Sequence, residues 1–141
     1  EVAAALEIPV AGGEQDYDLK QWQRIVAMRA VDICQPDVCY VGGLSRALQV
    51  AKMAENAGLQ CVPHSANHSL VTVFTLHMMG AIANAGPYAE FSIEGQSGTA
   101  GFYSPRLEAV DGMVQIPDGP GWGVTIDRSW LAHTDRMVSE L

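Results

Sequence analysis

Short apolar runs alternate with segments of helical periodicity over the first two thirds of the chain. The apolar runs predict buried strands, which cover residues 8–11, 30–35, 59–62 and 88–93. Between them, apolar residues recur every three or four positions and predict helices over residues 19–30, 44–57 and 69–83. Strands that alternate with helices of this length are typical of βα units around a parallel sheet, so we predict an α/β fold.

Each predicted strand has an ionisable residue at or near its C-terminal end, and these residues are Glu14, Asp37, His64 and Glu90. Enzymes built on (β/α) barrels carry their catalytic groups at this end of the strands. Eight units of this length would need roughly 215 residues, which is close to the size of a complete barrel. A doubly wound sheet also fits the alternation, but it normally places a glycine-rich phosphate loop after its first strand, and none follows here. We therefore favour half of a TIM-type barrel, made of four βα units.

The pattern changes beyond the fourth predicted strand, where glycine and serine become frequent. The apolar segments 113–116 and 124–126 flank a turn rich in glycine and proline, and they predict a hairpin. Asp127 is the expected N-cap of a last helix that would run to the end of the sequence. We therefore divide the chain into residues 1–95, the half-barrel, and residues 96–141, a tail that we expect to pack on something this chain does not contain.

Charge and composition disfavour two classes of partner. Eight basic and 16 acidic side chains give a formal net charge of −8, which argues against nucleic acid. No run approaches the roughly 18–20 apolar residues that span a bilayer, and no basic segment followed by an apolar one opens the sequence, so we expect no secretory signal. Cys34, Cys39 and Cys61 cannot all pair, and they fit the reduced thiols of a cytoplasmic protein. The sequence begins with Glu1 and not with Met, so we expect it to be part of a longer protein.

Five segments carry a family resemblance: PVAGGE at 9–14, QPDVCYVGGL at 35–44, PH at 63–64, AEF at 89–91 and IPDGPGWGV at 116–124. The first four resemble the last four barrel strands of the mandelate racemase/muconate lactonising enzyme family of the enolase superfamily. The fifth resembles the stretch that follows this barrel. Each motif is weak alone, but the ordered set covers nearly the whole chain. The resemblance implies the C-terminal half of the barrel, with a tail that packs on a capping domain absent from this chain.

The resemblance also implies a role for each ionisable residue at the strand ends. Glu14 matches the third of three carboxylate ligands of Mg²⁺, a cation that prefers oxygen ligands. Asp37 and His64 match the dyad of the mandelate racemase-like branch, in which the histidine is the general base or acid and the aspartate orients its ring. Glu90 matches the acid that, in its protonated form, donates a hydrogen bond to the substrate carboxylate as an enediolate forms.

The sequence alone also allows other roles for these residues. Glu14 also fits a solvated loop acid, Asp37 fits a turn residue or a helix cap, and His64 fits a core histidine. Glu94 competes with Glu90, because both have the same strand parity. The match of Tyr-Ala-Glu-Phe to the family favours Glu90.

The resemblance implies a Mg²⁺-dependent enzyme that removes a proton alpha to a carboxylate through an enediolate. We expect a hydro-lyase that dehydrates an acid sugar to a 2-keto-3-deoxy acid, with a racemase, epimerase or cycloisomerase of the same family as the alternative. The substrate would be a small-molecule carboxylate, and homo-oligomers are usual for the family.

The family's other two metal carboxylates, its Lys-x-Lys motif and its capping domain have no counterpart in this sequence. We therefore expect the chain alone to be inactive and to need the missing N-terminal half. A non-catalytic half-barrel that serves as a structural module is the alternative of another class.

Overall fold

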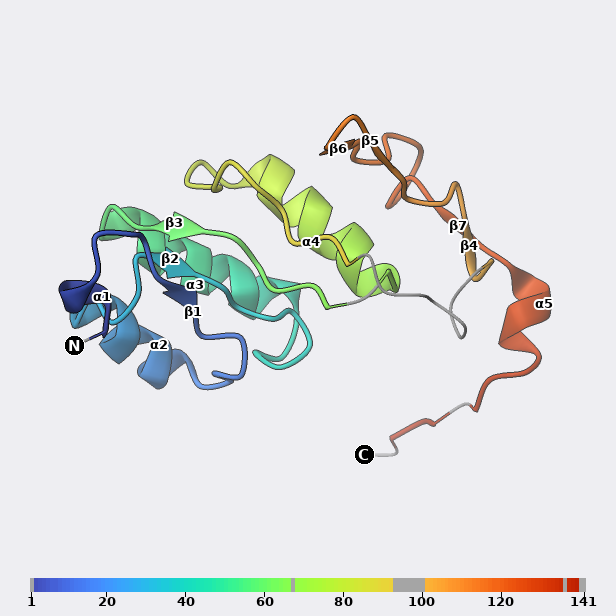
Figure 1. Ribbon diagram of the computed structural model, residues 1–141. Coiled ribbons are helices and arrows are strands. Elements are labelled where there is room, and N and C mark those ends of the chain that lie inside the picture. Colours follow the sequence, from blue (N-terminus) through green and yellow to red (C-terminus); the bar gives the residue numbers. More distant parts are fainter. Residues whose placement is uncertain (1, 67, 93–100, 136, 140–141) are drawn as a thin grey trace. The chain divides into compact units, whose positions relative to one another are not determined.

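The computed structural model describes residues 2–66, 68–92, 101–135 and 137–139. The contacts within the chain divide it into two compact units, residues 1–94 and residues 95–141 (Figure 1). The first unit is an α/β structure with parallel strands, a partial barrel, as the sequence predicts. Each unit is described separately below.

The first unit contains a parallel sheet in the order β1-β2-β3. Its strands are β1 (Ala11–Gly12), β2 (Ile33–Cys34) and β3 (Gln60–Cys61). In this register Gly12 lies beside Cys34, and Cys34 lies beside Cys61. A parallel bridge from Cys61 to Ala85 continues the sheet by one further segment. The strands therefore follow one another in the sheet in the order of the sequence, as they do in a (β/α) barrel.

The helices of the first unit begin and end at recognisable residues, and they are α1 (Val2–Ala5), α2 (Leu19–Ala27), α3 (Leu44–Asn56) and α4 (Leu70–Ala81). The Asp18 side chain accepts a hydrogen bond from the Lys20 N–H and caps α2. Ser69 caps α4 in the same way. After α3 the chain turns at Gly58, whose φ of +70° favours glycine.

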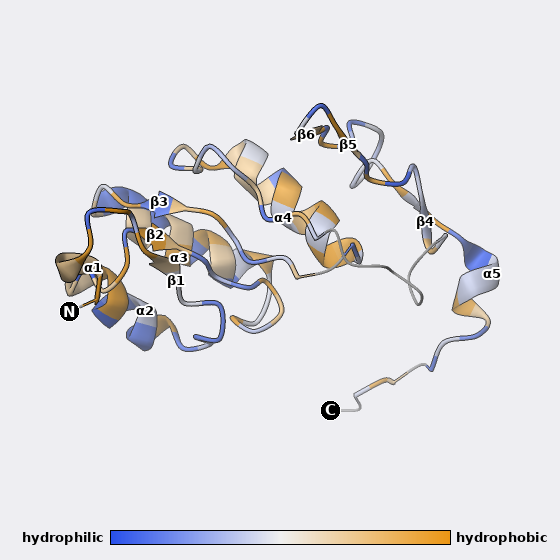
Figure 2. Cartoon of the chain, in the orientation of Figure 1, coloured by the Kyte–Doolittle hydropathy of each residue, from blue (hydrophilic) through white to orange (hydrophobic). Residues whose placement is uncertain are grey.

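The core of the first unit brings α2 and α3 together with the strands. Trp22 on α2 is completely buried, and Val50 and Ala54 present the buried side of α3. The thiols of Cys34 and Cys61 lie in the same cluster, so two of the three cysteines are small core residues. The hydropathy colours show apolar residues along much of α4 (Figure 2), and the buried residues of this helix are Thr72, Val73, Thr75, Leu76 and Met78. In the part of the chain that the structure describes, no helix is both long and apolar enough to cross a bilayer.

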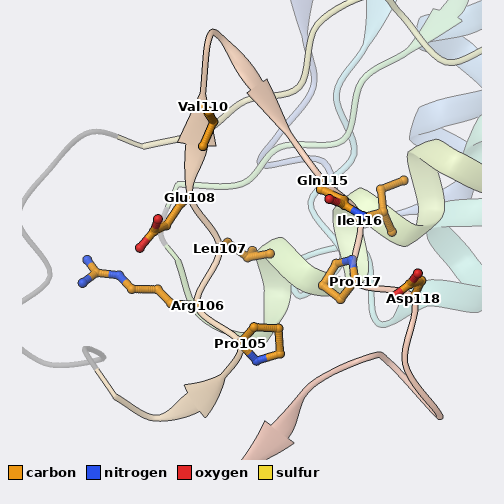
Figure 3. Close-up of a pocket in the computed structure, with 9 residues that line it drawn as sticks. All are labelled: Pro105, Arg106, Leu107, Glu108, Val110, Gln115, Ile116, Pro117 and Asp118. Atoms are coloured by element: carbon orange, nitrogen blue, oxygen red, sulfur yellow. The ribbon is translucent and has the colours of Figure 1, made fainter.

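The second unit is built from short antiparallel pairs. Its elements are β4 (Tyr103–Ser104), β5 (Ala109–Val110), β6 (Met113–Val114), β7 (Thr125–Ile126) and α5 (Arg128–Leu131). β4 pairs with β7, and β5 pairs with β6. A cavity of about 330 Å³ lies between the segments on either side of the β5–β6 hairpin (Figure 3). Leu107 and Ile116 line it among prolines and charged side chains.

The predicted fourth strand over residues 88–93 is wrong for the described residues 88–92, which form no strand. The pairing with β3 occurs earlier: the Cys61 N–H donates to the Asn84 carbonyl at 2.9 Å, and the Gly86 N–H donates to the Cys61 carbonyl at 3.3 Å. In this parallel register the next bond would run from the N–H of residue 63 to the Gly86 carbonyl, and Pro63 has no N–H, so the ladder ends there.

The predicted hairpin between 113–116 and 124–126 is also wrong. Met113–Val114 pairs instead with Ala109–Val110 across the two-residue turn Asp111-Gly112. Both turn residues have positive φ, +51° and +75°, as expected for an Asp-Gly turn between two strands. Because β6 is paired with β5 through this local turn, it does not pair with the segment 124–126 across the longer connection.

The predicted helix from Asp127 to the C-terminus begins as expected but ends at Leu131 among the described residues. The Asp127 carboxylate caps it by accepting a hydrogen bond from the Ser129 N–H at 2.8 Å. At the other end the Thr134 hydroxyl donates to the Leu131 carbonyl at 3.0 Å. In a longer helix this carbonyl would accept a hydrogen bond from a backbone N–H four residues further on.

Candidate active site

The parallel register carries the ends of β1, β2 and β3 to one edge of the sheet. Beyond the strands, the Gln35 N–H donates to the Gly12 carbonyl at 2.9 Å, and the His64 N–H donates to the Pro36 carbonyl at 3.2 Å. Asp37 and His64 then lie side by side as a parallel bridge. The backbone alone therefore sets two of the predicted site residues next to each other.

Asp37 and His64 form a hydrogen-bonded pair. His64 Nδ1 lies 2.8 Å from Asp37 Oδ2. The other oxygen, Asp37 Oδ1, accepts hydrogen bonds from the N–H groups of Cys39 and Tyr40 at 2.7 and 3.0 Å. Asp37 is 7 % exposed, so its carboxylate is held by the protein and not by water. This arrangement fixes the imidazole ring and leaves Nε2 as the nitrogen that can react.

Two further carboxylates face the Nε2 atom of His64. Glu14 Oε2 lies 3.3 Å from it and Glu90 Oε2 lies 3.9 Å from it. Both side chains are partly open to solvent, at 49 % and 39 % exposure, whereas the His64 side chain is 15 % exposed. The structure thus brings together Glu14, Asp37, His64 and Glu90, the residues that the sequence places at the strand ends, whereas Glu94, the alternative to Glu90, lies outside the described residues.

The surroundings of His64 favour its protonated form. Burial alone lowers the pKa of His64, and this is the largest single influence on the group. The hydrogen bond to Asp37 and the negative charges of Glu90, Glu14 and Asp37 act in the opposite direction and together outweigh it. The pKa of His64 is therefore raised above its ordinary value of 6.5.

The loop that carries Glu14 rests on Trp22. Gly13 has a φ of +103°, and a β-carbon at this position would lie 2.3 Å from the Trp22 ring. The Trp22 indole N–H donates to the Asp16 carbonyl at 2.8 Å, on the far side of Glu14. The buried indole therefore fixes the backbone on both sides of this glutamate.

Ser65 is a site residue that the sequence analysis missed. Its N–H donates to Glu90 Oε2 at 2.7 Å, and its hydroxyl donates to Thr72 Oγ1 on α4 at 2.9 Å. Ser65 is 1 % exposed, so this contact is built into the fold. The contact to Glu90 is made by the backbone, which any residue type offers, and for this reason no side-chain pattern could have indicated it.

The carboxylates that the structure describes do not by themselves make a magnesium site. Among the residues that the structure describes, no group of three or more His, Cys, Asp or Glu side chains could hold a metal ion. Glu14 offers a hard, partly exposed oxygen donor, which is the right ligand type. One such carboxylate is too few, and the role of Glu14 as a metal ligand stays a prediction.

Comparison with known proteins gives the family. The family described as enolase C-terminal domain-like matches residues 1–130. The chain is 37 % identical over 140 residues to a D-galactarolactone cycloisomerase of Agrobacterium fabrum, covering 94 % of this chain and 37 % of the relative. It is 31 % identical over 125 residues to an arabinonate dehydratase of Saccharolobus solfataricus, covering 89 % of this chain and 33 % of the relative.

A solved structure supports the same assignment. A provisionally named racemase from Roseobacter denitrificans superposes with a TM-score of 0.92 at 51 % identity, covering 99 % of this chain and 39 % of the other. The chain belongs to the enolase superfamily, within its mandelate racemase-like members. It spans between a third and two fifths of the length of these relatives.

Proposed function

We propose that the chain supplies the proton-transfer half of an active site that, in a complete protein, removes a proton alpha to a carboxylate. The observation that supports this most directly is the fixed imidazole of His64, with Asp37 on one nitrogen and two carboxylates around the other. Relatives at 31 % and 37 % identity bear the names of a dehydratase and a cycloisomerase, and both act on sugar-derived acids or their lactones.

The geometry of the Asp37–His64 pair indicates which nitrogen accepts the proton from the substrate. Nδ1 stays hydrogen-bonded to Asp37, so Nε2 is the atom that takes the α-proton. The positive charge that then forms on the ring is stabilised by the Asp37 carboxylate. Glu90, which Ser65 holds beside Nε2, would in its protonated form donate a hydrogen bond to a substrate carboxylate oxygen as negative charge moves onto that oxygen. Mg²⁺ would supply the main stabilisation of that charge, with Glu14 as one ligand and the others from outside this chain.

Dehydration is the reaction that we favour. Loss of the α-proton and then of the β-hydroxyl as water leaves an enol, which becomes a 2-keto-3-deoxy acid. Protonated His64 can return the proton to the departing hydroxyl, so the atoms balance without another reagent. The cycloisomerase relative and the racemase name of the Roseobacter structure favour isomerisation as the second candidate. Both reactions begin with the same proton transfer.

The test compares histidine variants in the full-length protein. A panel of five- and six-carbon aldonates and aldarates is incubated with Mg²⁺, and the 2-keto-3-deoxy product is measured. We expect His64→Asn to lower the rate about 10²- to 10⁴-fold. The control is His133→Asn, which changes an exposed histidine of the second unit that lies beyond α5 and hydrogen-bonds the Ser129 carbonyl. Wild-type rates in His64→Asn would contradict the proposal, and inactivity of the wild type on every acid would favour a structural module.

A further inference from the structure

Strand pairing does not hold Glu90 in place. Asp37 and His64 are set side by side by their parallel bridge, whereas the described residues 88–92 form no strand. The Glu90 side chain is also 39 % exposed, and a flexible carboxylate of this kind turns freely into water unless other contacts restrain it. The distance of 3.9 Å between Glu90 Oε2 and His64 Nε2 therefore depends on contacts outside the sheet.

A hydrogen bond and a ring contact join the segment of Glu90 to the loop after His64. The Ser65 N–H donates to Glu90 Oε2 at 2.7 Å. The rings of His68 and Phe91 lie 4.1 Å apart, measured between their centroids, at an angle of 41°. Because both contacts begin in the loop after His64, the position of Glu90 follows the position of this loop.

The same loop is anchored to α4 by buried hydroxyl groups. The Ser65 hydroxyl donates to Thr72 Oγ1 on α4 at 2.9 Å, and both residues are 1 % exposed. The helix itself is fixed by buried side chains, among them Val73 and Leu76. Removing the Thr72 hydroxyl takes away the acceptor that the buried Ser65 hydroxyl uses, in a place where water does not replace it. The hydrogen bond therefore ties the loop to a packed helix.

We propose that Ser65 and Thr72 are positioning residues for Glu90. Their buried hydrogen bond sets the backbone N–H of Ser65, and this N–H keeps the Glu90 carboxylate beside His64. Both hydroxyls act through Glu90 and not on the substrate. The inference rests on the proposed function, because it assumes that Glu90 binds the substrate carboxylate during proton removal.

The test removes the buried hydroxyl of α4 in the full-length protein, with the aldonate that is turned over fastest. Thr72→Val puts a methyl group in place of the hydroxyl, so the shape of the side chain is kept and the acceptor of Ser65 is lost. We expect kcat to fall about tenfold with KM little changed, because Glu90 is displaced from the place where charge develops in the transition state. Thr72→Ser keeps a hydroxyl and should stay close to the wild-type rate.

Thr75→Val is the matched control. Thr75 lies one turn further along α4 and is also 1 % exposed. Among the residues that the structure describes, its hydroxyl has no hydrogen-bond partner, so the same change should leave kcat unchanged. Equal losses in the two valine variants would overturn the proposal. It would also be overturned if Thr72→Val kept the wild-type rate while Glu90→Ala slowed the reaction.

A double variant shows whether the effect of Thr72 passes through Glu90. In Glu90→Ala protein there is no carboxylate left to position, so we expect Thr72→Val to change the remaining rate less than about twofold. A further loss as large as the one in the wild-type background would mean that Thr72 acts through His64 or through the fold as a whole, and it would contradict the proposal.

An NMR measurement separates this proposal from the proposed function. The Ser65 amide proton is bonded to a carboxylate at 2.7 Å and should resonate at low field, whether or not a substrate is turned over. We expect this signal to move upfield in Glu90→Ala and in Thr72→Val, and to stay in place in Thr75→Val. An unchanged signal in Thr72→Val would overturn the positioning role. Failure of the proposed function would instead appear as turnover independent of His64 and Glu90, with the Ser65 signal moving as expected.

Discussion

In the first unit the helices and strands pack on a shared apolar core, whereas in the described residues of the second unit short antiparallel pairs hold the backbone with little buried apolar surface. The core of the first unit surrounds Trp22, Cys34 and Cys61, which are wholly buried. Among the described residues of the second unit, the buried hydrophobic side chains are Tyr103 and Leu107. Two-residue ladders are marginal by themselves, so the stability of the first unit should rest on side-chain packing and that of the second on backbone turns.

The difference explains where the candidate site lies. A catalytic group needs a backbone that keeps it within a fraction of an ångström of its partner, and a packed core provides this. His64 and Asp37 follow strands that are joined to this core, and Glu14 lies in a loop that rests on Trp22. The described part of the second unit offers turns and exposed caps instead.

Two tryptophans test the contrast most strongly. Trp22→Ala removes a fully buried indole and its hydrogen bond to the Asp16 carbonyl, and we expect a loss of about 3–5 kcal/mol in the free energy of unfolding. Trp122→Ala removes an indole that is 41 % exposed, and we expect a loss of about 1 kcal/mol or less. Urea denaturation of the two variants measures both values. Equal losses would show that the two units do not differ in the way described.

Two glycines provide the next test. Gly13→Ala places a β-carbon 2.3 Å from the Trp22 ring in a left-handed backbone, and we expect a loss of roughly 1–3 kcal/mol together with displacement of Glu14. Gly121→Ala has the same kind of backbone, with a φ of +67°, but no atom within 4 Å of the new β-carbon. It should cost about 1 kcal/mol from the backbone alone. A Gly121 variant as unstable as the Gly13 variant in urea denaturation would argue against the role of Trp22.

The N-caps of α2 and α5 form a third pair. Asp18→Ala should lower the free energy of unfolding of the first unit by about 1 kcal/mol, because α2 carries core residues. Asp127→Ala should open α5 locally and leave the main unfolding transition unchanged, because no residue of this short helix is buried. Hydrogen exchange of the α2 and α5 amides distinguishes the two cases, and a shift of the main transition by Asp127→Ala would contradict the expectation.

The pH dependence of His64 is the smallest expected effect on stability. Its folded-state pKa is raised, so protonation stabilises the fold; this contribution is complete below about pH 6.5 and is lost as pH rises through the folded-state pKa. Asp37→Asn removes the hydrogen bond that opposes the effect of burial, and the pKa of His64 should fall. NMR titration of the ring protons measures this, with His133 as the internal reference. An unchanged pKa of His64 in the variant would show that Asp37 does not control its charge.

Much of the first unit could be predicted from sequence because its pattern is set by burial. Helical periodicity placed α2, α3 and α4, and the apolar runs placed β1, β2 and β3 to within a few residues. The grouping of Glu14, Asp37 and His64 then followed from parallel strands ending at one edge. Glu90 also lies in this group although the strand predicted around it is absent from the described residues, since the Ser65 N–H holds its carboxylate there.

The second unit resisted prediction because backbone chemistry, and not burial, decides its pairing. The Asp111-Gly112 turn directed β6 to β5, although the apolar pattern alone favoured a partner farther along the chain. The hydrogen bond of Thr134 to Leu131 lies at the end of the short last helix, where the Asp127 cap had led us to predict a long one. Local competition of this kind leaves no periodic signal.

The account depends on proton transfer at the carbon next to a carboxylate, and isotope exchange measures that step directly. The full-length protein is incubated in D₂O with Mg²⁺ and an aldonate, and the α-proton signal is followed by NMR in the wild type, His64→Asn and His133→Asn. We predict deuterium at the α-position or in the product for the wild type and His133→Asn, and none for His64→Asn within the same time. Exchange that continues unchanged without the His64 imidazole would contradict the account.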